Sequence, residues 1–177
     1  MIPRKNPFDL GPPAGPQEIT PEMDADLLDQ IKKIPELSSA SEVVIKSIHE
    51  ASREATKRHF EVFYLKAYLI EHLDLPTKKR AGEIARSILE PVRALAKRDQ
   101  TISRGFKSAI WRYSGAPCAV DAKRMTTEDI ERTEAHKAAE GKEYDLRQGL
   151  FVQGIYTWPR RAPGCKCFSA TVIEGFT

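Results

Sequence analysis

Two cysteines stand one residue apart near the C-terminal end of the sequence, in the stretch APGCKCFSATVI, residues 162 to 173. The chain has only three cysteines, and this pair, Cys165 and Cys167, holds two of them. An alternating apolar run follows a Pro-Gly pair here, which predicts a strand. Because residues i and i+2 of a strand point to the same face, we expect the two sulfurs side by side. A disulfide between them would close a small strained ring, whereas two thiolates could share one soft metal ion.

A tetrahedral zinc site needs four ligands, so two more side chains must join the cysteine pair. Cys118 follows a predicted strand, and His136 lies on a predicted short helix just before a glycine turn. Asp121, three residues after Cys118, is a spare oxygen ligand. We therefore predict a structural zinc site formed by Cys118, His136, Cys165 and Cys167. Buried apolar thiols and a reactive thiol remain as alternatives.

Motifs that carry catalysis are not found in the sequence. It has no Gly-rich phosphate loop, no His-Glu-x-x-His and no Gly-x-Ser-x-Gly. Three histidines lie on or beside a predicted helix among charged residues, which favours solvated or capping roles, and three acidic residues fit the first turn of a helix. These residues are His49, His59, His72, Glu128, Asp129 and Glu131. We expect a protein that is not an enzyme.

The composition is that of a soluble globular chain. Of its 177 residues, 41% are apolar and 30% are charged, which allows one domain, or a small domain with an extended arm. No apolar run approaches the roughly 20 residues that span a bilayer, so we expect no membrane segment. No apolar stretch of a secretory signal follows the N-terminal charges, which predicts a reducing compartment.

Positive charge is concentrated in the middle of the chain. The net charge is only +3, but Lys and Arg outnumber carboxylates from Lys57 to Arg112. Such a segment could attract nucleic acid or an acidic protein surface. A solvated helix face has the same composition, so both interpretations stay open.

The first half of the sequence predicts an extended arm and then helices. Residues 1–19 are rich in proline, which favours an extended arm that becomes ordered on a partner. Residues 20–34 form a short helix that begins with a Thr-Pro pair. Longer helices are expected at 40–73 and at 77–100, the second kinked or broken at Pro91. Their apolar faces are expected to pack together, and these faces comprise Val44, Ile48, Val62, Leu65 and Leu69 on the first and Ile84, Ile88, Val92 and Leu95 on the second.

The second half predicts short strands with one short helix. Strands are expected at 106–115, 142–146, 150–158 and 165–173, and a helix between a threonine cap and Gly141. Trp111 and Trp158 are expected to anchor the core of this half. The fold class is therefore α+β, with an arm at 1–19, a helical region at 20–104 and a β-rich module at 105–177.

Four stretches of this sequence, in this order, resemble the phage Mu F-like minor head proteins, also called phage head morphogenesis proteins. They are KRDQ at 97–100, IWRYSGAPC at 110–118, HKAAEGKEYDLRQGL at 136–150 and WPRRAPGCKC at 158–167. The resemblance covers residues 95–175. Two departures stand out, because Lys166 replaces a usual arginine and Asp121 stands where many members have a second cysteine.

The resemblance implies a minor structural protein of a tailed-phage head that acts in head morphogenesis near the portal. Its implied partners are the portal or major capsid protein and, through Lys57–Arg112, packaged DNA, with several copies in each particle. The implied location is the virion, and the host cytoplasm during assembly. The alternative is a basic nucleic-acid-binding protein with a structural zinc module.

Overall fold

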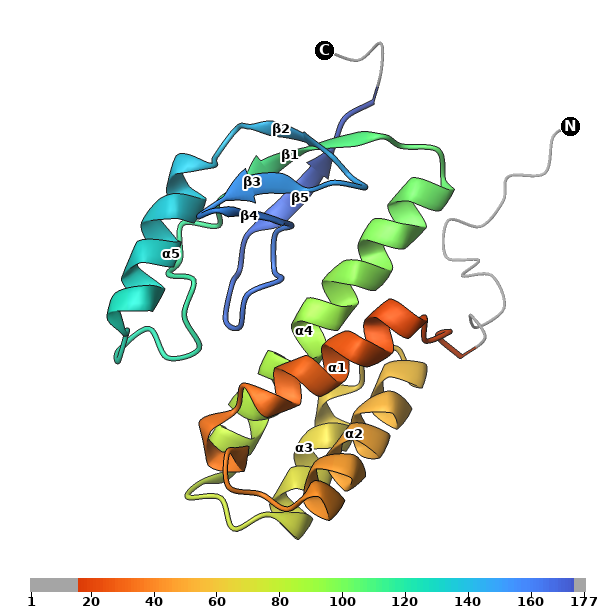
Figure 1. Cartoon of the computed structure of the whole chain (residues 1–177), viewed down its shortest axis with the longest axis vertical. Coiled ribbons are helices and arrows are strands. Elements are labelled where there is room, and N and C mark those ends of the chain that lie inside the picture. Colours follow the sequence, from red (N-terminus) through yellow and green to blue (C-terminus); the bar gives the residue numbers. More distant parts are fainter. Residues whose placement is uncertain (1–15, 174–177) are drawn as a thin grey trace, which may run out of the picture.

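The structure is a computed structural model that describes residues 16–173. Helices occupy the first part of the chain and a small antiparallel sheet the second, so the α+β class is confirmed (Figure 1). Helix α4 runs from the helical region to the sheet. The arm predicted at 1–19 falls mostly outside the described residues, and Gln17 donates its backbone N–H to the Lys57 carbonyl. None of the helices in the described range is long and apolar enough to cross a membrane.

A side-chain N-cap begins four of the helices in the described range, one capped by Ser41 and three by threonines. The hydroxyls of Thr20, Thr77 and Thr126 each accept a hydrogen bond from a backbone N–H of the first helical turn. Asp129 completes a capping box with Thr126, which confirms the predicted threonine cap. The helices and the short 3-10 turn are α1 (Pro21–Lys32), η1 (Pro35–Leu37), α2 (Glu42–Lys57), α3 (Val62–His72), α4 (Lys78–Ser103) and α5 (Thr127–Ala138).

The single helix predicted at 40–73 is wrong, because α2 and α3 are separate helices. His59 and Phe60 both have positive φ angles, and the chain turns at these two residues between α2 and α3. Phe60 is buried, and Arg93 donates a hydrogen bond of 2.7 Å to its carbonyl oxygen. The apolar periodicity continues through this turn, so the sequence pattern resembles one helix.

The break allowed for at Pro91 does not occur, since α4 continues through this residue. Pro91 removes one backbone hydrogen bond from the helix interior. Its neighbours Ile88, Leu89 and Val92 are all fully buried, as is the adjoining face of α3. The packing of these side chains therefore offsets the backbone hydrogen bond that is lost at Pro91.

The buried apolar residues of the helical region form one cluster across α1 to α4. Helix α3 packs on α4, with Leu65 and Leu69 fully buried against the α4 face that was predicted to face them. Ile48 of α2 is buried in the same cluster, whereas Val44 and Val62 are only partly buried. Helix α1 also packs on α2 and α4, so four helices share this core.

A second cluster lies in the β-rich part, around the fully buried Trp111. Strand β1 is central, with β2 and β5 antiparallel on its two sides. The strand predicted at 150–158 is a hairpin instead, because Gln153 and Gly154 both have positive φ angles and turn the chain between β3 and β4. The strands are β1 (Ser108–Arg112), β2 (Glu143–Asp145), β3 (Leu150–Val152), β4 (Ile155–Thr157) and β5 (Phe168–Thr171).

The segment Trp158–Arg161 joins the two clusters. The Arg98 guanidinium of α4 lies 4.7 Å from the centre of the Trp158 ring, and Trp158 donates to the Leu146 carbonyl. Arg161 Nη1 lies 2.5 Å from Oδ2 of Asp26 on α1, whose side chain is only 4% exposed. Trp158 was predicted to anchor the core of the β-rich half. It lies instead at the junction of the two halves.

Replacing Leu65 by alanine should lower the free energy of unfolding by about 2–5 kcal/mol, because the side chain is 0% exposed and leaves a cavity. Urea denaturation of the full chain measures this. Phe63→Ala on the same helix is the matched control, since Phe63 is 77% exposed and its loss should change stability by less than about 0.5 kcal/mol. Equal effects of the two variants would contradict the packing described.

Candidate metal centre

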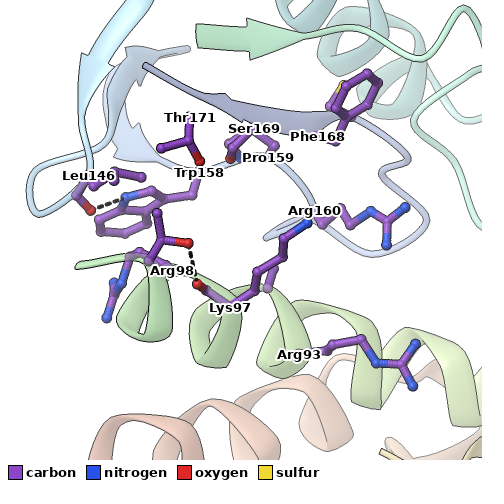
Figure 2. Close-up of a pocket in the computed structure, with 13 residues that line it drawn as sticks. Arg93, Lys97, Arg98, Leu146, Trp158, Pro159, Arg160, Phe168, Ser169 and Thr171 are labelled. Carbon is purple, nitrogen blue, oxygen red and sulfur yellow. Dashed lines mark hydrogen bonds between the residues drawn. The ribbon is translucent and has the colours of Figure 1, made fainter. Parts of the chain in front are cut away.

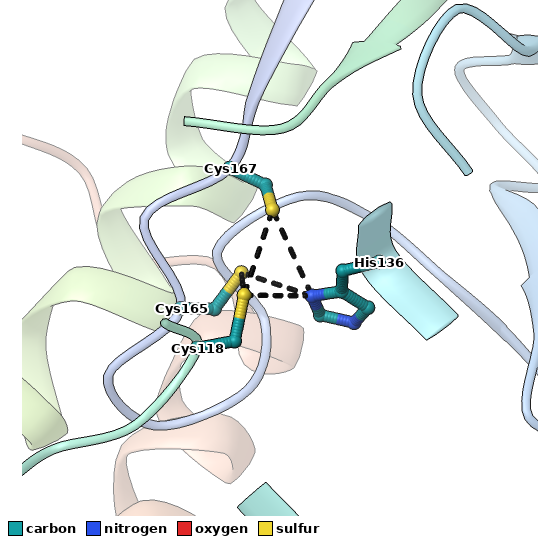
Figure 3. Close-up of side chains that lie close together, drawn as sticks. All are labelled: Cys118, His136, Cys165 and Cys167. Carbon is teal, nitrogen blue, oxygen red and sulfur yellow. Dashed lines mark hydrogen bonds between the residues drawn. The ribbon is translucent and has the colours of Figure 1, made fainter. Parts of the chain in front are cut away.

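The four predicted ligands lie together in the folded chain. Cys118 is in the loop after β1, His136 is on α5, and the other two cysteines are in the loop before β5. All four are buried, and their ligand atoms lie within 4.8 Å of one another. Figure 3 shows the four side chains pointing to a common centre. The structure thus confirms that Cys118, His136, Cys165 and Cys167 form a candidate metal site.

The pair Cys165 and Cys167 reaches this site in a different way from the one predicted. Strand β5 begins at Phe168, so both cysteines precede the strand. The backbone N–H of Cys165 donates to the Ala162 carbonyl in a turn, which directs its sulfur toward the cluster. The side-by-side sulfurs therefore come from a loop rather than from strand alternation.

The distances between ligand atoms suit a tetrahedral ion. With metal–sulfur bonds near 2.3 Å and a metal–nitrogen bond near 2.0 Å, a tetrahedron places two sulfurs about 3.8 Å apart and sulfur about 3.5 Å from nitrogen. Cys118 Sγ lies 3.7 Å from both of the other sulfurs. Nδ1 of His136 lies 3.2, 3.4 and 3.7 Å from the sulfurs of Cys118, Cys165 and Cys167. These five separations are thus close to the spacing that a zinc-sized ion requires, and the two sulfurs of Cys165 and Cys167 lie within 4.8 Å of each other.

A disulfide does not account for this arrangement. All three cysteines are free, and the 3.7 Å separations from Cys118 Sγ are far longer than an S–S bond of about 2.05 Å. A buried imidazole nitrogen requires a polar partner, and packed thiols can provide one through the contacts of 3.2 to 3.7 Å to Nδ1 of His136. A metal ion bound by all four atoms would supply such a partner for each of them.

The thiols strongly influence one another's ionisation. Hydrogen bonding to Cys165, together with burial, raises the pKa of Cys118 to about 11. Hydrogen bonds from Cys118 and Cys167 lower the pKa of Cys165 well below its ordinary value, and bonding to the same two thiols raises that of Cys167. One thiolate therefore forms readily and the next two do not. A divalent cation removes this obstacle, since it deprotonates the thiols that coordinate it.

Two side chains of α5 form hydrogen bonds with the backbone of Cys118. The Cys118 N–H donates to Oγ1 of Thr133 at 3.0 Å, and the Cys118 carbonyl accepts from Nε and Nη2 of Arg132 at 3.0 and 2.8 Å. Asp129 in turn binds the Arg132 guanidinium. The same helix carries His136, whose ring meets Trp111 edge-on at 4.9 Å between centroids. One helix thus positions two of the four ligands, and sequence reasoning did not identify Arg132 or Thr133.

Gly164 sets the distance between the two ligand loops. It has a φ angle of +71°, and a Cβ atom at this position would lie 2.2 Å from the Ala119 carbonyl carbon. The backbones after Cys118 and before Cys165 are therefore in direct contact, which only glycine permits. The Pro-Gly pair in the sequence indicated a turn here but gave no sign of this approach.

The other candidate residues lie outside the cluster. Asp121 is exposed, and its Oδ1 accepts from the Lys123 backbone N–H, so it does not join the four ligands. His49 Nε2 lies 3.1 Å from Asp24 Oδ1, and His72 stacks on Tyr68. The remaining four are exposed or part of a helix cap, and they are His59 in the α2–α3 turn and Glu128, Asp129 and Glu131 on α5.

Comparisons of this chain with family models, curated proteins and solved structures find no match.

Gly164→Ala should destabilise the protein by at least about 3 kcal/mol, because the methyl group forces the ligand loops apart. Gly154→Ala is the matched control, since its φ angle of +84° imposes the same left-handed strain with nothing within 4 Å. The control should lose only about 1–2 kcal/mol. Thermal unfolding of both variants measures the difference, and equal losses would refute the role given to the close approach.

Proposed function

We propose that this chain is a non-catalytic minor structural protein of a tailed-phage head, which acts in head morphogenesis near the portal. The observation that carries the proposal is that the separate stretches behind the family resemblance meet in one place. The strand with Trp111 packs on His136, and the loop of WPRRAPGCKC supplies Cys165 and Cys167 to the same cluster. Residues scattered over about 50 positions of the chain thus serve one structural unit.

We infer further that the metal is zinc and that its role is structural. Three thiolates and one imidazole are a donor set that zinc prefers. Bound to one ion, the four side chains would fill all four positions of a tetrahedron and leave none for water or substrate. The ion would join α5 and the loops on either side of the sheet, and a module with such short strands needs this support. This is the basis for proposing a protein without enzyme activity.

The purified full-length protein should contain about one zinc ion per chain, and a chelator should lower its melting temperature. Elemental analysis and thermal unfolding measure these two quantities. Cys167→Ser should lose the metal, because one of the four ligands is removed. Asp121→Asn should keep it, since this carboxylate lies outside the cluster. Metal-free wild-type protein with unchanged melting temperature would refute the zinc site.

The arrangement of charge favours the head protein over a general nucleic-acid-binding protein. Many cations between Lys57 and Arg112 are already neutralised within the chain, as expected for structural ion pairs on helices. The pairs are Arg58–Glu54, Arg80–Glu36, Arg93–Glu90, Arg98–Glu22 and Arg112–Glu140. The segment as a whole therefore does not form one uninterrupted positive surface.

Co-expression with the portal and major capsid proteins of a phage that encodes this chain should yield portal rings that carry it. Size-exclusion chromatography and electron microscopy of the particles would locate it near the portal. Complexes that persist at about 200 mM salt support assembly through protein contacts, since contacts to phosphate weaken by orders of magnitude in this range. Purified heads that lack the chain, together with no co-elution with either protein, would overturn the proposal.

A further inference from the structure

A cavity of about 140 Å³ lies between α4 and the segment from Trp158 to Thr171. Four of its lining side chains are cationic, and none carries a carboxylate (Figure 2). Arg93, Lys97 and Arg98 come from α4, and Arg160 comes from the opposite wall. In Figure 2 the Lys97 side chain extends from the helix toward this wall. Such a lining attracts a small anion.

The positive charge of this cavity is only partly neutralised within the chain. Arg93 and Arg160 share one carboxylate, Glu90, at 2.8 and 3.3 Å. Arg98 is ion-paired with both Glu22 and Asp99, and its guanidinium also lies over the face of Trp158. Lys97 is exposed and forms no ion pair with any residue in the described range. The cavity therefore keeps an excess of positive charge.

The cationic lining continues beyond the cavity. Arg160 also lines a neighbouring hollow together with Arg86 and Lys166, beside Cys165. Arg86 and Lys166 are exposed, and neither is ion-paired within residues 16–173. The two hollows share Arg160 in their linings, and we call them together the α4 groove, whose cations are Arg86, Arg93, Lys97, Arg98, Arg160 and Lys166. Only two carboxylates, Glu83 and Glu90, line it as well.

We propose that the α4 groove binds phosphate groups, and that its ligand is the phosphodiester backbone of a single-stranded nucleic acid. The cavity has room for one such group, and the cations that continue past Arg160 suit the next groups of a chain. Phe168 lines the same cavity and is 48% exposed, so a base can stack on its ring. The inference goes beyond the proposed function, because the assembly of a head does not by itself require a nucleic-acid ligand in this groove.

Fluorescence anisotropy with a labelled single-stranded oligonucleotide and the full-length protein tests the proposal. Arg86→Glu combined with Lys97→Glu should weaken binding at least tenfold and make the dependence of affinity on salt less steep, because two phosphate contacts are lost. Lys46→Glu combined with Lys123→Glu is the matched control. It changes the net charge equally at exposed positions outside the groove, and it should bind nearly as the wild type does.

Unchanged metal content and melting temperature verify that both double variants fold. Equal weakening by the two variants, or no binding by the wild type, overturns the proposal. Inorganic phosphate and an acidic peptide serve as competing ligands, followed by NMR shifts of the groove residues. Equal affinity for the acidic peptide would assign the groove to a protein partner and overturn the nucleic-acid ligand. Groove variants that still join portal rings separate this inference from the proposed function, since each can then fail alone.

Discussion

The direct contact between two loop backbones is the constraint on which the β-rich part depends. Gly164 lies against Ala119, and this approach places Cys165 beside Cys118. Helix α5 fixes the other side of the cluster, because it binds the Cys118 backbone and carries His136. The short strands of this part provide few backbone hydrogen bonds, so the meeting of these loops determines how the strands are held.

The loop that contains Gly164 also links the candidate metal site to the helical region. Within Trp158–Cys167, the first residues contact α4 and α1 through Arg98, Glu90 and Asp26, and the last supply two ligands. Any movement of the ligand loop is therefore transmitted to its contacts with the helices. This coupling explains how a small module without a large core of its own is held firmly on α4.

Local signals in the sequence predicted most of the elements, and long-range contacts determined the rest. The caps at Thr20, Thr77 and Thr126 depend on adjacent residues only, and all three were predicted. The turn at Phe60 was missed because it depends on Arg93, which lies on another helix. The ligand set was predicted from residue types, since cysteine and histidine are uncommon here. The loop that directs Cys165 was not, because the alternating pattern that predicts the strand begins at Cys165, whereas the strand itself begins at Phe168.

The buried pairing of Asp26 with Arg161 bears on how the chain reaches its native state. Asp26 lies on the first helix, and its partner is synthesised far later. A carboxylate in this position is unfavourable to bury alone. While the ribosome is still making the second half, burial of Asp26 would leave its carboxylate with the Gln30 side chain but no ionic partner, so we expect this part of α1 to pack late. Complete folding of the helices should follow the emergence of Arg161, so the early part of the chain would wait in a looser state for the late part.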